Sequence, residues 1–121
     1  NGLKNVYIFI GISSLKDKLS VPAKQLFDRI FNEKSENTIF IFADHYTSYR
    51  KLQLESWYQN NIDNNTGIWL GSGIGGQMIL NVNNLSIDDR NLSYPYMALV
   101  INNGNYKFIK HVVDMEEENE K

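Results

Sequence analysis

The sequence predicts an α/β fold with a mainly parallel sheet and a C-terminal β-hairpin, because three local patterns agree. Two near-continuous apolar runs, residues 6–12 and 38–43, are rich in β-branched and aromatic residues, which is typical of strands covered on both faces. An amphipathic helical pattern separates these runs, as in a βαβ unit. Near the end of the chain, Asn103-Gly104 stands between two apolar runs, which is a strong hairpin signal.

Length and composition limit the classes of protein that the chain can represent. The 121 residues have room for one domain, which we assign to residues 1–113, and residues 114–121 read as an acidic tail. The formal net charge is −2 and the basic residues are scattered, so the charge pattern of a nucleic-acid-binding protein is missing. The absence of cysteine excludes disulfides and thiolate metal sites. No apolar run is long enough to span a bilayer.

Helical patterns follow each of the two predicted strands. After Ser13-Ser14 ends the first strand, Ser20 and Pro22 predict the start of a helix that fades near residues 32–35. A second helix is expected from Thr47 or Ser48 to about Asn60. The apolar residues of the first helix are Leu26, Phe27, Ile30 and Phe31, and the core contacts expected from the second are Tyr49, Leu52 and Trp57.

The second half of the chain is richer in turn residues than the first. We expect a loop over residues 60–65 and a short third strand over residues 67–71, followed by a glycine-rich turn over residues 71–76. Residues 77–82 fit a strand or a helical turn equally well, and residues 83–95 are polar and irregular.

Three segments resemble a known family over nearly the whole chain. Asn5–Ile10 is similar to the Walker B strand of FtsK/SpoIIIE-type ATPases, and Thr38–His45 resembles their following strand, where a polar residue senses nucleotide. Gly67–Gln77 resembles a segment of the third, C-terminal ATPase-like domain of EssC-type proteins from firmicute type VII secretion systems. The most distinctive part of this segment is Trp-Leu-Gly-x-Gly-Ile-x-x-Gln.

The resemblance implies the C-terminal portion of a P-loop NTPase (RecA-like) three-layer domain, within the cytoplasmic part of a coupling protein anchored in the cell membrane. It implies that this last module acts in substrate recognition and assembly rather than catalysis. The implied partners are WXG-type helical-hairpin export substrates, neighbouring ATPase domains of the same polypeptide and further copies in a homo-oligomer, hexameric in the family, with no nucleic acid. No cofactor is expected in this chain, whereas ATP and Mg²⁺ belong to the parent protein.

The residues required for ATP hydrolysis can be tested one at a time. The phosphate-binding pattern Gly-x-x-x-x-Gly-Lys-Ser/Thr is missing, and in the family it would lie upstream of Asn1. A Walker B strand ends in an acid that holds Mg²⁺, but here the strand runs into Gly11, Ser13 and Ser14, and the next acid is Asp17. Because serine is no base near neutral pH, we expect a degenerate Walker B position and no catalytic residue. The alternatives at this position are a plain strand-to-loop turn and a residual nucleotide contact.

Asp44 and His45 stand at a sensor-like position, at the carboxyl end of the second strand. They would contact nucleotide or a partner, or Asp44 would cap backbone amides near Thr47. The two histidines, His45 and His111, lack ligand-spaced partners, so no metal site is expected.

The glycine cluster of residues 71–76 carries the last candidate site. Gly71, Gly73 and Gly76 have the spacing of a dinucleotide-binding loop, but no convincing helix follows them. We therefore interpret Trp69, Gly71, Gly73 and Gln77 as a partner-binding surface, with Trp69 either beneath it or part of it. Besides recognition, two functions stay open: an ATP-driven motor domain of protein or DNA, and a structural lid that completes a larger fold.

Overall fold

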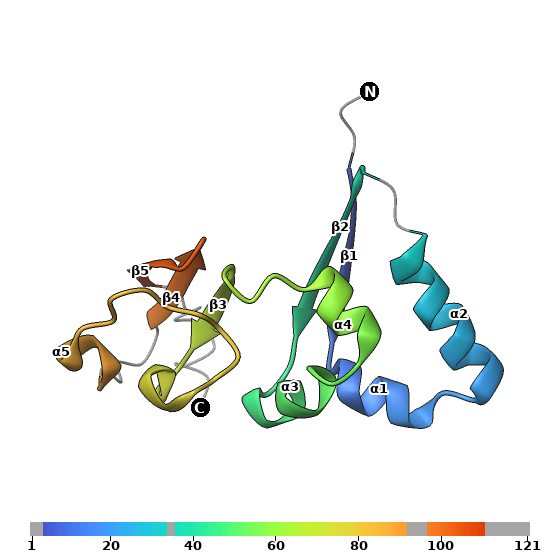
Figure 1. The fold of residues 1–121 in the computed structure, drawn as a ribbon, viewed down its shortest axis with the longest axis horizontal. Helices are drawn as coiled ribbons and strands as arrows, with labels where there is room; N and C mark the ends of the chain where they lie inside the picture. The colour runs from blue at the N-terminus through green and yellow to red at the C-terminus, as the bar shows by residue number, and fades with distance from the viewer. Residues whose placement is uncertain (1–3, 34–35, 92–96, 111–121) are drawn as a thin grey trace, which may run out of the picture. The chain divides into compact units, whose positions relative to one another are not determined.

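A computed structural model describes residues 4–33, 36–91 and 97–110 of the chain. Their elements are β1 (Asn5–Ile10), α1 (Ile12–Lys18), α2 (Val21–Asn32), β2 (Thr38–Ala43), α3 (Tyr46–Leu52), α4 (Ser56–Asn61), β3 (Gly67–Leu70), the 3₁₀ helix η1 (Ile74–Gly76), α5 (Ile87–Arg90), β4 (Met97–Asn102) and β5 (Asn105–Lys110) (Figure 1). The predicted acidic tail, residues 114–121, and His111 lie outside the described residues.

Contacts divide the chain into two compact units, which are described separately. The N-terminal unit comprises residues 1–62 and the C-terminal unit comprises residues 63–121. The boundary falls within the polar stretch of residues 60–65 that the sequence predicts as a loop. Within the described ranges, no helix has the length and apolar character needed to cross a membrane.

The N-terminal unit is built on a parallel pair of strands. β1 pairs with β2 so that Tyr7 lies opposite Phe40 and Phe9 lies opposite Phe42. Because side chains alternate along a strand, these four rings share one face of the pair. The other face carries aliphatic side chains, namely those of Val6, Ile8, Ile10, Ile39 and Ile41.

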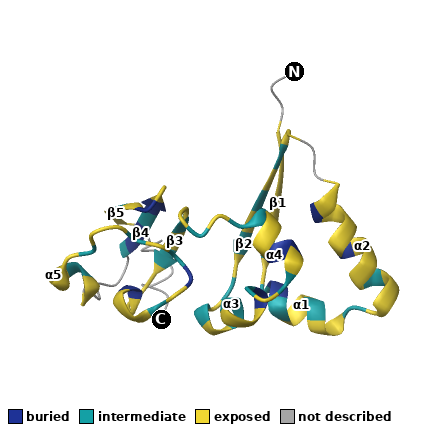
Figure 2. Ribbon diagram, viewed as in Figure 1, coloured by how far each residue is buried: buried dark blue, intermediate teal, exposed yellow. Residues whose placement is uncertain are grey.

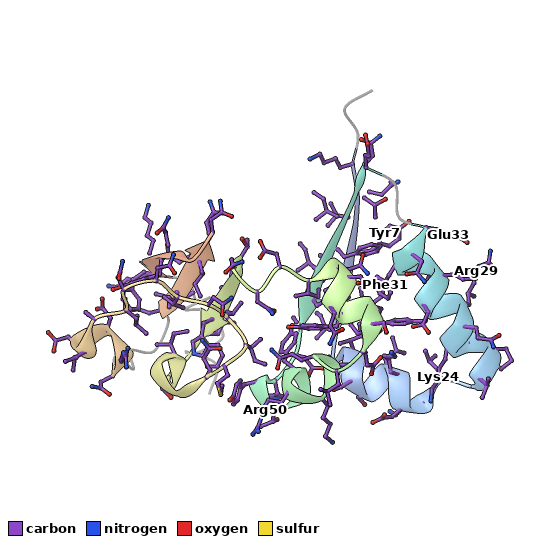
Figure 3. All side chains as sticks on the ribbon, viewed as in Figure 1. Tyr7, Lys24, Arg29, Phe31, Glu33 and Arg50 are labelled. Carbon is purple, nitrogen blue, oxygen red and sulfur yellow. The ribbon has the colours of Figure 1, made fainter. Side chains whose placement is uncertain are left out.

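Helices cover the aromatic face and form the core of this unit. Phe31 of α2 is 1% exposed, and its ring centroid lies 4.9 Å from that of Phe40 and 5.0 Å from that of Trp57 on α4. Figure 3 shows Phe31 between α2 and the strands, and Figure 2 shows the buried residues of the helices turned toward the sheet. Phe27 packs edge-on against Phe31 at 4.8 Å, so the core is a cluster of aromatic rings in tilted, edge-on and stacked arrangements.

The aliphatic face is not covered by any described residue of the unit. Its exposed fractions run from 39% at Ile39 to 82% at Ile10. The sequence predicts strands covered on both faces, and this expectation is wrong for the described residues. The reason is that the buried residues of the helices, including Ile12, Leu52 and Trp57, all belong to the aromatic core. The unit therefore presents an unusually apolar sheet surface, because parallel sheets are normally covered on both sides.

The helices differ from the expected ones in two places. Residues 12–18 form α1, where the sequence indicates a turn and a loop. Gly11 enters the left-handed region with φ 71°, so the chain can turn from β1 directly into a helix that buries Ile12 completely. The single helix expected over residues 47–60 is two helices, α3 and α4, whose N-cap positions are His45 and Glu55.

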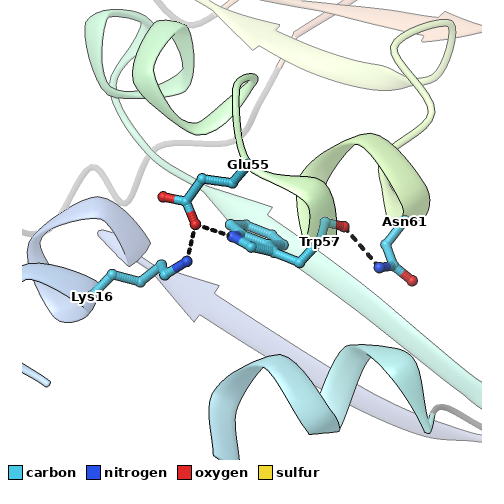
Figure 4. A network of polar contacts seen from close by, with 4 residues as sticks. All are labelled: Lys16, Glu55, Trp57 and Asn61. Atoms are coloured by element: carbon cyan, nitrogen blue, oxygen red, sulfur yellow. Dashed lines mark hydrogen bonds and ion pairs between the residues drawn. The ribbon is translucent and has the colours of Figure 1, made fainter. Parts of the chain in front are cut away.

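A polar contact network fixes the connection between α3 and α4 (Figure 4). The Glu55 carboxylate forms an ion pair with Lys16 of α1 and accepts a hydrogen bond from the Trp57 indole. The Lys16 ammonium lies 5.3 Å from the ring centroid of Phe27 and 5.1 Å from that of Trp57, within reach of cation–π attraction. Because Lys16 is 39 residues from Glu55 in the sequence, no local pattern predicts their ion pair.

The C-terminal unit contains an antiparallel sheet in the order β3-β4-β5. Trp69 lies opposite Leu99, which lies opposite Phe108 on the other side. On this face Leu99, Ile101 and Ile74 are buried, and partly buried side chains pack against them: Trp69, Leu80, Val82, Leu85, Tyr106 and Phe108. On the opposite face Ile68 and Leu70 are exposed.

The predicted hairpin is confirmed, with β4 and β5 joined by Asn103-Gly104. Both turn residues have positive φ, 51° and 82°, as a type I′ turn requires. The positive φ of Gly104 favours glycine here, and a Cβ, only 2.4 Å from Asn83 Nδ2, would also force the Asn83 side chain to move. The Gly104 amide donates to the Asn65 carbonyl at 2.8 Å, which ties the turn to the start of the unit.

The described strands do not form the mainly parallel sheet that the sequence predicts. Two strands are parallel and three are antiparallel, because the two-residue turn allows only antiparallel pairing of β4 and β5, and β3 pairs with β4 to pack Trp69 on the core. Residues 77–82 form neither a strand nor a helix, and the region predicted as irregular contains α5.

Candidate functional site

The predicted site residues lie in two places, one in each unit. The first is the carboxyl edge of β1 and β2, where Gly11, Ser13 and Ser14 follow one strand and Asp44 and His45 follow the other. The second is the glycine-rich segment that follows β3.

Ser13 and Asp44 are in direct contact at the carboxyl edge. The Ser13 hydroxyl donates to Asp44 Oδ2 at 2.9 Å, and the Ser13 amide donates to the same oxygen at 3.1 Å. The Gly11 amide still pairs with the Ala43 carbonyl at 2.9 Å, which keeps the two strand ends together. The two positions that the sequence analysis predicts as a degenerate Walker B site and a sensor site are therefore joined by hydrogen bonds, while Ser14 is exposed beside them.

Asp44 is held as a carboxylate by its donors. Its partial burial on its own would raise the pKa, but hydrogen bonds from the Ser13 amide and hydroxyl, the His45 amide and the Ser48 side chain outweigh burial and lower the pKa below its ordinary value. The His45 amide donates to Asp44 Oδ1 at 2.8 Å, so both carboxylate oxygens accept protein hydrogen bonds.

The side chains at this edge do not provide the oxygen ligands of a Mg²⁺–nucleotide centre. Mg²⁺ demands near-octahedral oxygen ligands, and the one carboxylate present is already bound by Ser13 and His45. Over the ranges that the structure describes, no group of three His, Cys, Asp or Glu side chains could hold a metal ion. The arrangement suits a structural tie between two strand ends.

His45 has a backbone role at this edge. It occupies the N-cap position of α3 with an exposed side chain, and its amide is one of the Asp44 donors. The alternative in which Asp44 forms hydrogen bonds near the start of the next helix agrees with its contacts to the His45 amide and the Ser48 side chain, but the sequence does not predict its second contact, with Ser13 across the two strands.

The glycine-rich segment folds over Trp69. Gly71 and Gly73 have φ values of 86° and 92°, which fold the segment back toward the sheet. The Trp69 indole donates to the Ser72 carbonyl at 3.1 Å, and a Cβ at Gly73 would lie 3.9 Å from the Trp69 ring. Trp69 is half-buried and packs on the core, so it lies beneath the loop rather than on an open surface.

Gln77 holds the chain after this loop. Its Oε1 accepts from the amides of Ile79 and Leu80, both at 2.7 Å, and its Nε2 donates to the Leu80 carbonyl at 2.7 Å. The side-chain amide is thus engaged inside its own turn. Of the four residues predicted as a partner-binding surface, Trp69 and Gln77 are structural in this unit.

A cavity of about 380 Å³ adjoins the same loop and is lined by Ser72, Gly73, Gly75, Gly76, Arg90 and Asn91. Arg90 is not among the predicted site residues, because residues 83–95 read as polar and irregular. A signal was present: Ser86 and Asp89 have the spacing of a capping box, and the Ser86 hydroxyl does accept from the Asp89 amide at 3.0 Å. That cap begins α5, the element that carries Arg90 to the loop.

Comparisons of the chain with models of protein families, with curated proteins and with solved structures found no match.

Proposed function

We propose that the chain is the C-terminal part of a catalytically degenerate FtsK/SpoIIIE-like module in the coupling protein of a type VII secretion system. In this proposal the module recognises WXG-type export substrates and takes part in assembly, and it hydrolyses no ATP. The protein would be anchored in the cell membrane, with this module on the cytoplasmic side.

The hydrogen-bonded pair of Ser13 and Asp44 carries the proposal. In an active motor of this family, the first strand ends in an acid that binds Mg²⁺. Here Ser13 stands after that strand and occupies the neighbouring carboxylate with two hydrogen bonds. Because this carboxylate is already hydrogen-bonded to Ser13, we infer that the module keeps the fold of the family but uses it to bind a partner rather than to hydrolyse ATP.

The uncovered sheet faces support the assembly part of the proposal. Contiguous exposed apolar side chains on a protein surface commonly mark places where another protein surface packs. The aliphatic face of β1 and β2 offers Val6, Ile8 and Ile10 from one strand and Ile39 and Ile41 from the other.

Calorimetric titration of a WXG-type helical-hairpin protein into the chain tests substrate recognition. The proposal predicts saturable binding. The matched control is the same hairpin protein with its export signal removed, which should bind much more weakly. Equal heats for both proteins, or no heat at high micromolar concentration, would remove substrate recognition from the account.

An ATP-driven motor domain is the alternative, and the position of Asp44 at the end of β2 is the observation in its favour, against the hydrogen bonds that already occupy its carboxylate. Nucleotide-binding proteins hold their ligands at the carboxyl edge of parallel strands, which is where Asp44 lies. Its lowered pKa keeps the Asp44 side chain ionised at neutral pH. This alternative predicts that ATP with Mg²⁺ stabilises the chain, by about 2.7 kcal/mol at a hundredfold excess over the dissociation constant. An unchanged melting temperature in a thermal scan with ATP and Mg²⁺ rejects it, and a nucleotide-dependent rise accompanied by ATP hydrolysis rejects the degenerate module.

A further inference from the structure

We propose that the cavity beside the glycine-rich loop binds an oxyanion, a carboxylate or a phosphate group, through the guanidinium of Arg90. The inference concerns the C-terminal unit alone and does not depend on the proposed function.

The shape of the cavity depends on a close approach between Gly75 and Arg90. A Cβ at Gly75 would lie 2.9 Å from Arg90 Cβ and 3.0 Å from Arg90 Cγ, so any larger residue would displace the arginine stem. Gly73 and Gly76 line the same space without side chains. The cavity is therefore open at the loop, and its only charged lining side chain among the described residues is that of Arg90.

The charge of Arg90 is available in the part of the chain that the structure describes. No described residue forms an ion pair with its guanidinium or accepts a side-chain hydrogen bond from it. The two neighbouring acids do not line the cavity, and Asp89 instead accepts a hydrogen bond from the Tyr106 hydroxyl. Arginine is always protonated in proteins, so an exposed positive charge stands at the cavity wall.

Several contacts hold Arg90 at this place. The Asp89–Tyr106 hydrogen bond ties α5 to β5 of the sheet, and the Ser86 hydroxyl caps the start of α5. At the end of α5, the Asn91 side chain donates to the Ile87 carbonyl at 3.1 Å. An arginine whose backbone is fixed on both sides loses less freedom on binding than one on a free loop.

The chemistry of the lining selects an oxyanion. A guanidinium presents a planar fork of donors that fits carboxylate and phosphate oxygens in pairs. Ser72 adds a hydroxyl to the wall. Within the described ranges, the backbone amides of Ser72 and Gly73 donate to no backbone carbonyl. They are therefore further hydrogen-bond donors that the loop can offer to an oxyanion. The cavity is larger than a phosphate ion, which leaves room for part of the molecule that carries the anion.

Amide NMR titration of the whole chain tests the proposal, with inorganic phosphate in one arm and a blocked tetraglutamate peptide in the other. We expect saturable shifts at Gly73, Gly75 and Gly76 in at least one arm. Arg90→Gln should weaken binding roughly tenfold or more, as expected for loss of a charged hydrogen-bonding partner. Arg50→Gln is the matched control, because Arg50 is an exposed arginine on α3 in the other unit, and it should leave binding unchanged.

Each outcome decides something. Saturation by phosphate alone identifies a phosphate group as the ligand chemistry, and saturation by the peptide alone identifies a carboxylate. Both forms of the proposal are overturned if neither probe saturates, if the shifts spread over the surface without preference for the loop, or if Arg90→Gln and Arg50→Gln weaken binding equally. The folding of Arg90→Gln is checked in the same spectra by the unchanged amides of β4 and β5.

Discussion

The sheet of the N-terminal unit is held by helices that bring aromatic rings onto one of its faces, whereas the sheet of the C-terminal unit is held by a tight turn and by loops. Phe27 and Phe31 reach the first sheet from α2, and Trp57 reaches it from α4. In the second sheet, β4 and β5 are joined by two residues, and Asn83 and Asn65 bind the turn directly. The comparison shows that the parallel pair depends on packing by separate helices, while the β4–β5 hairpin is set largely by the backbone geometry of its turn.

Replacement of Phe31 by alanine should have the largest effect on this comparison. Phe31 is 1% exposed and its ring packs on Phe27, Phe40 and Trp57, so the change should cost about 3–5 kcal/mol of unfolding free energy. Hydrogen exchange should lose protection in β1 and β2 while β3 to β5 keep theirs. Ile101→Ala, at an equally buried position of the other sheet, should give the reverse pattern. Equal loss of protection in both sheets would contradict the division into two units.

Gly104→Ala tests the turn of the C-terminal unit. The positive φ and the 2.4 Å approach to Asn83 Nδ2 should make alanine cost about 1–3 kcal/mol, measured by denaturant unfolding. Gly76→Ala is the control, since nothing lies within 4 Å of a Cβ there and its φ is not positive. If both glycines tolerate alanine equally, local backbone geometry does not set this hairpin.

Ser13→Ala should have a smaller effect, on both stability and the pKa of Asp44. Loss of the hydroxyl should cost about 1 kcal/mol, because Asp44 is only partly buried. The Asp44 pKa should rise toward its ordinary value in a carbon-detected NMR titration. Ser14→Ala is the control, because Ser14 is exposed and outside the contact.

The pH dependence follows from the direction of this shift. A folded-state pKa below the unfolded value means that Asp44 stabilises the fold fully above the unfolded pKa, about 3.9, and loses this contribution as pH falls through the folded pKa. Ser13→Ala should therefore destabilise the chain near neutral pH more than in strong acid. If Ser13→Ala lowered the unfolding free energy equally at both pH values, the stabilisation by the Ser13 hydrogen bond would not depend on the charge of the Asp44 carboxylate.

Ile41→Thr should have the smallest effect on stability. Ile41 lies on the uncovered aliphatic face, so its replacement should change unfolding free energy by about 0.5 kcal/mol or less. Phe42→Ala is the contrasting variant, because Phe42 packs on the covered, aromatic face and its loss should cost more stability. Light scattering should show less self-association for Ile41→Thr than for the unchanged chain. A large loss of unfolding free energy for Ile41→Thr would instead mean that the aliphatic face is covered in solution.

Local patterns in the sequence predict β1, β2, α2 and the hairpin, because each depends on neighbouring residues. They fail at α1, where burial of Ile12 overrides the weak helix preference of Ser13 and Ser14. They predict β3 over residues 67–71, and the structure has it at Gly67–Leu70, but they do not predict its partner, which is set by the packing of Trp69 on Leu99 and Ile74. These outcomes depend on contacts between residues that are distant in the sequence.

The candidate site was predicted in part. The sequence indicates that Ser13 and Asp44 follow neighbouring strands, but their direct contact depends on the turn at Gly11 and on the start of α1. Arg90 was missed because a four-residue helix leaves no periodic pattern, although the Ser86 cap was visible in the sequence.

The response of the Asp44 carboxyl carbon to Mg²⁺ with ATP tests most directly whether this edge is a structural tie or a metal site. NMR of the labelled chain follows this signal as the complex is added at millimolar concentration. The Ser13 contact predicts an unchanged chemical shift and an unchanged low pKa. A saturable shift that requires both Mg²⁺ and ATP, and that Asp44→Asn abolishes, would contradict the structural tie and establish a nucleotide site.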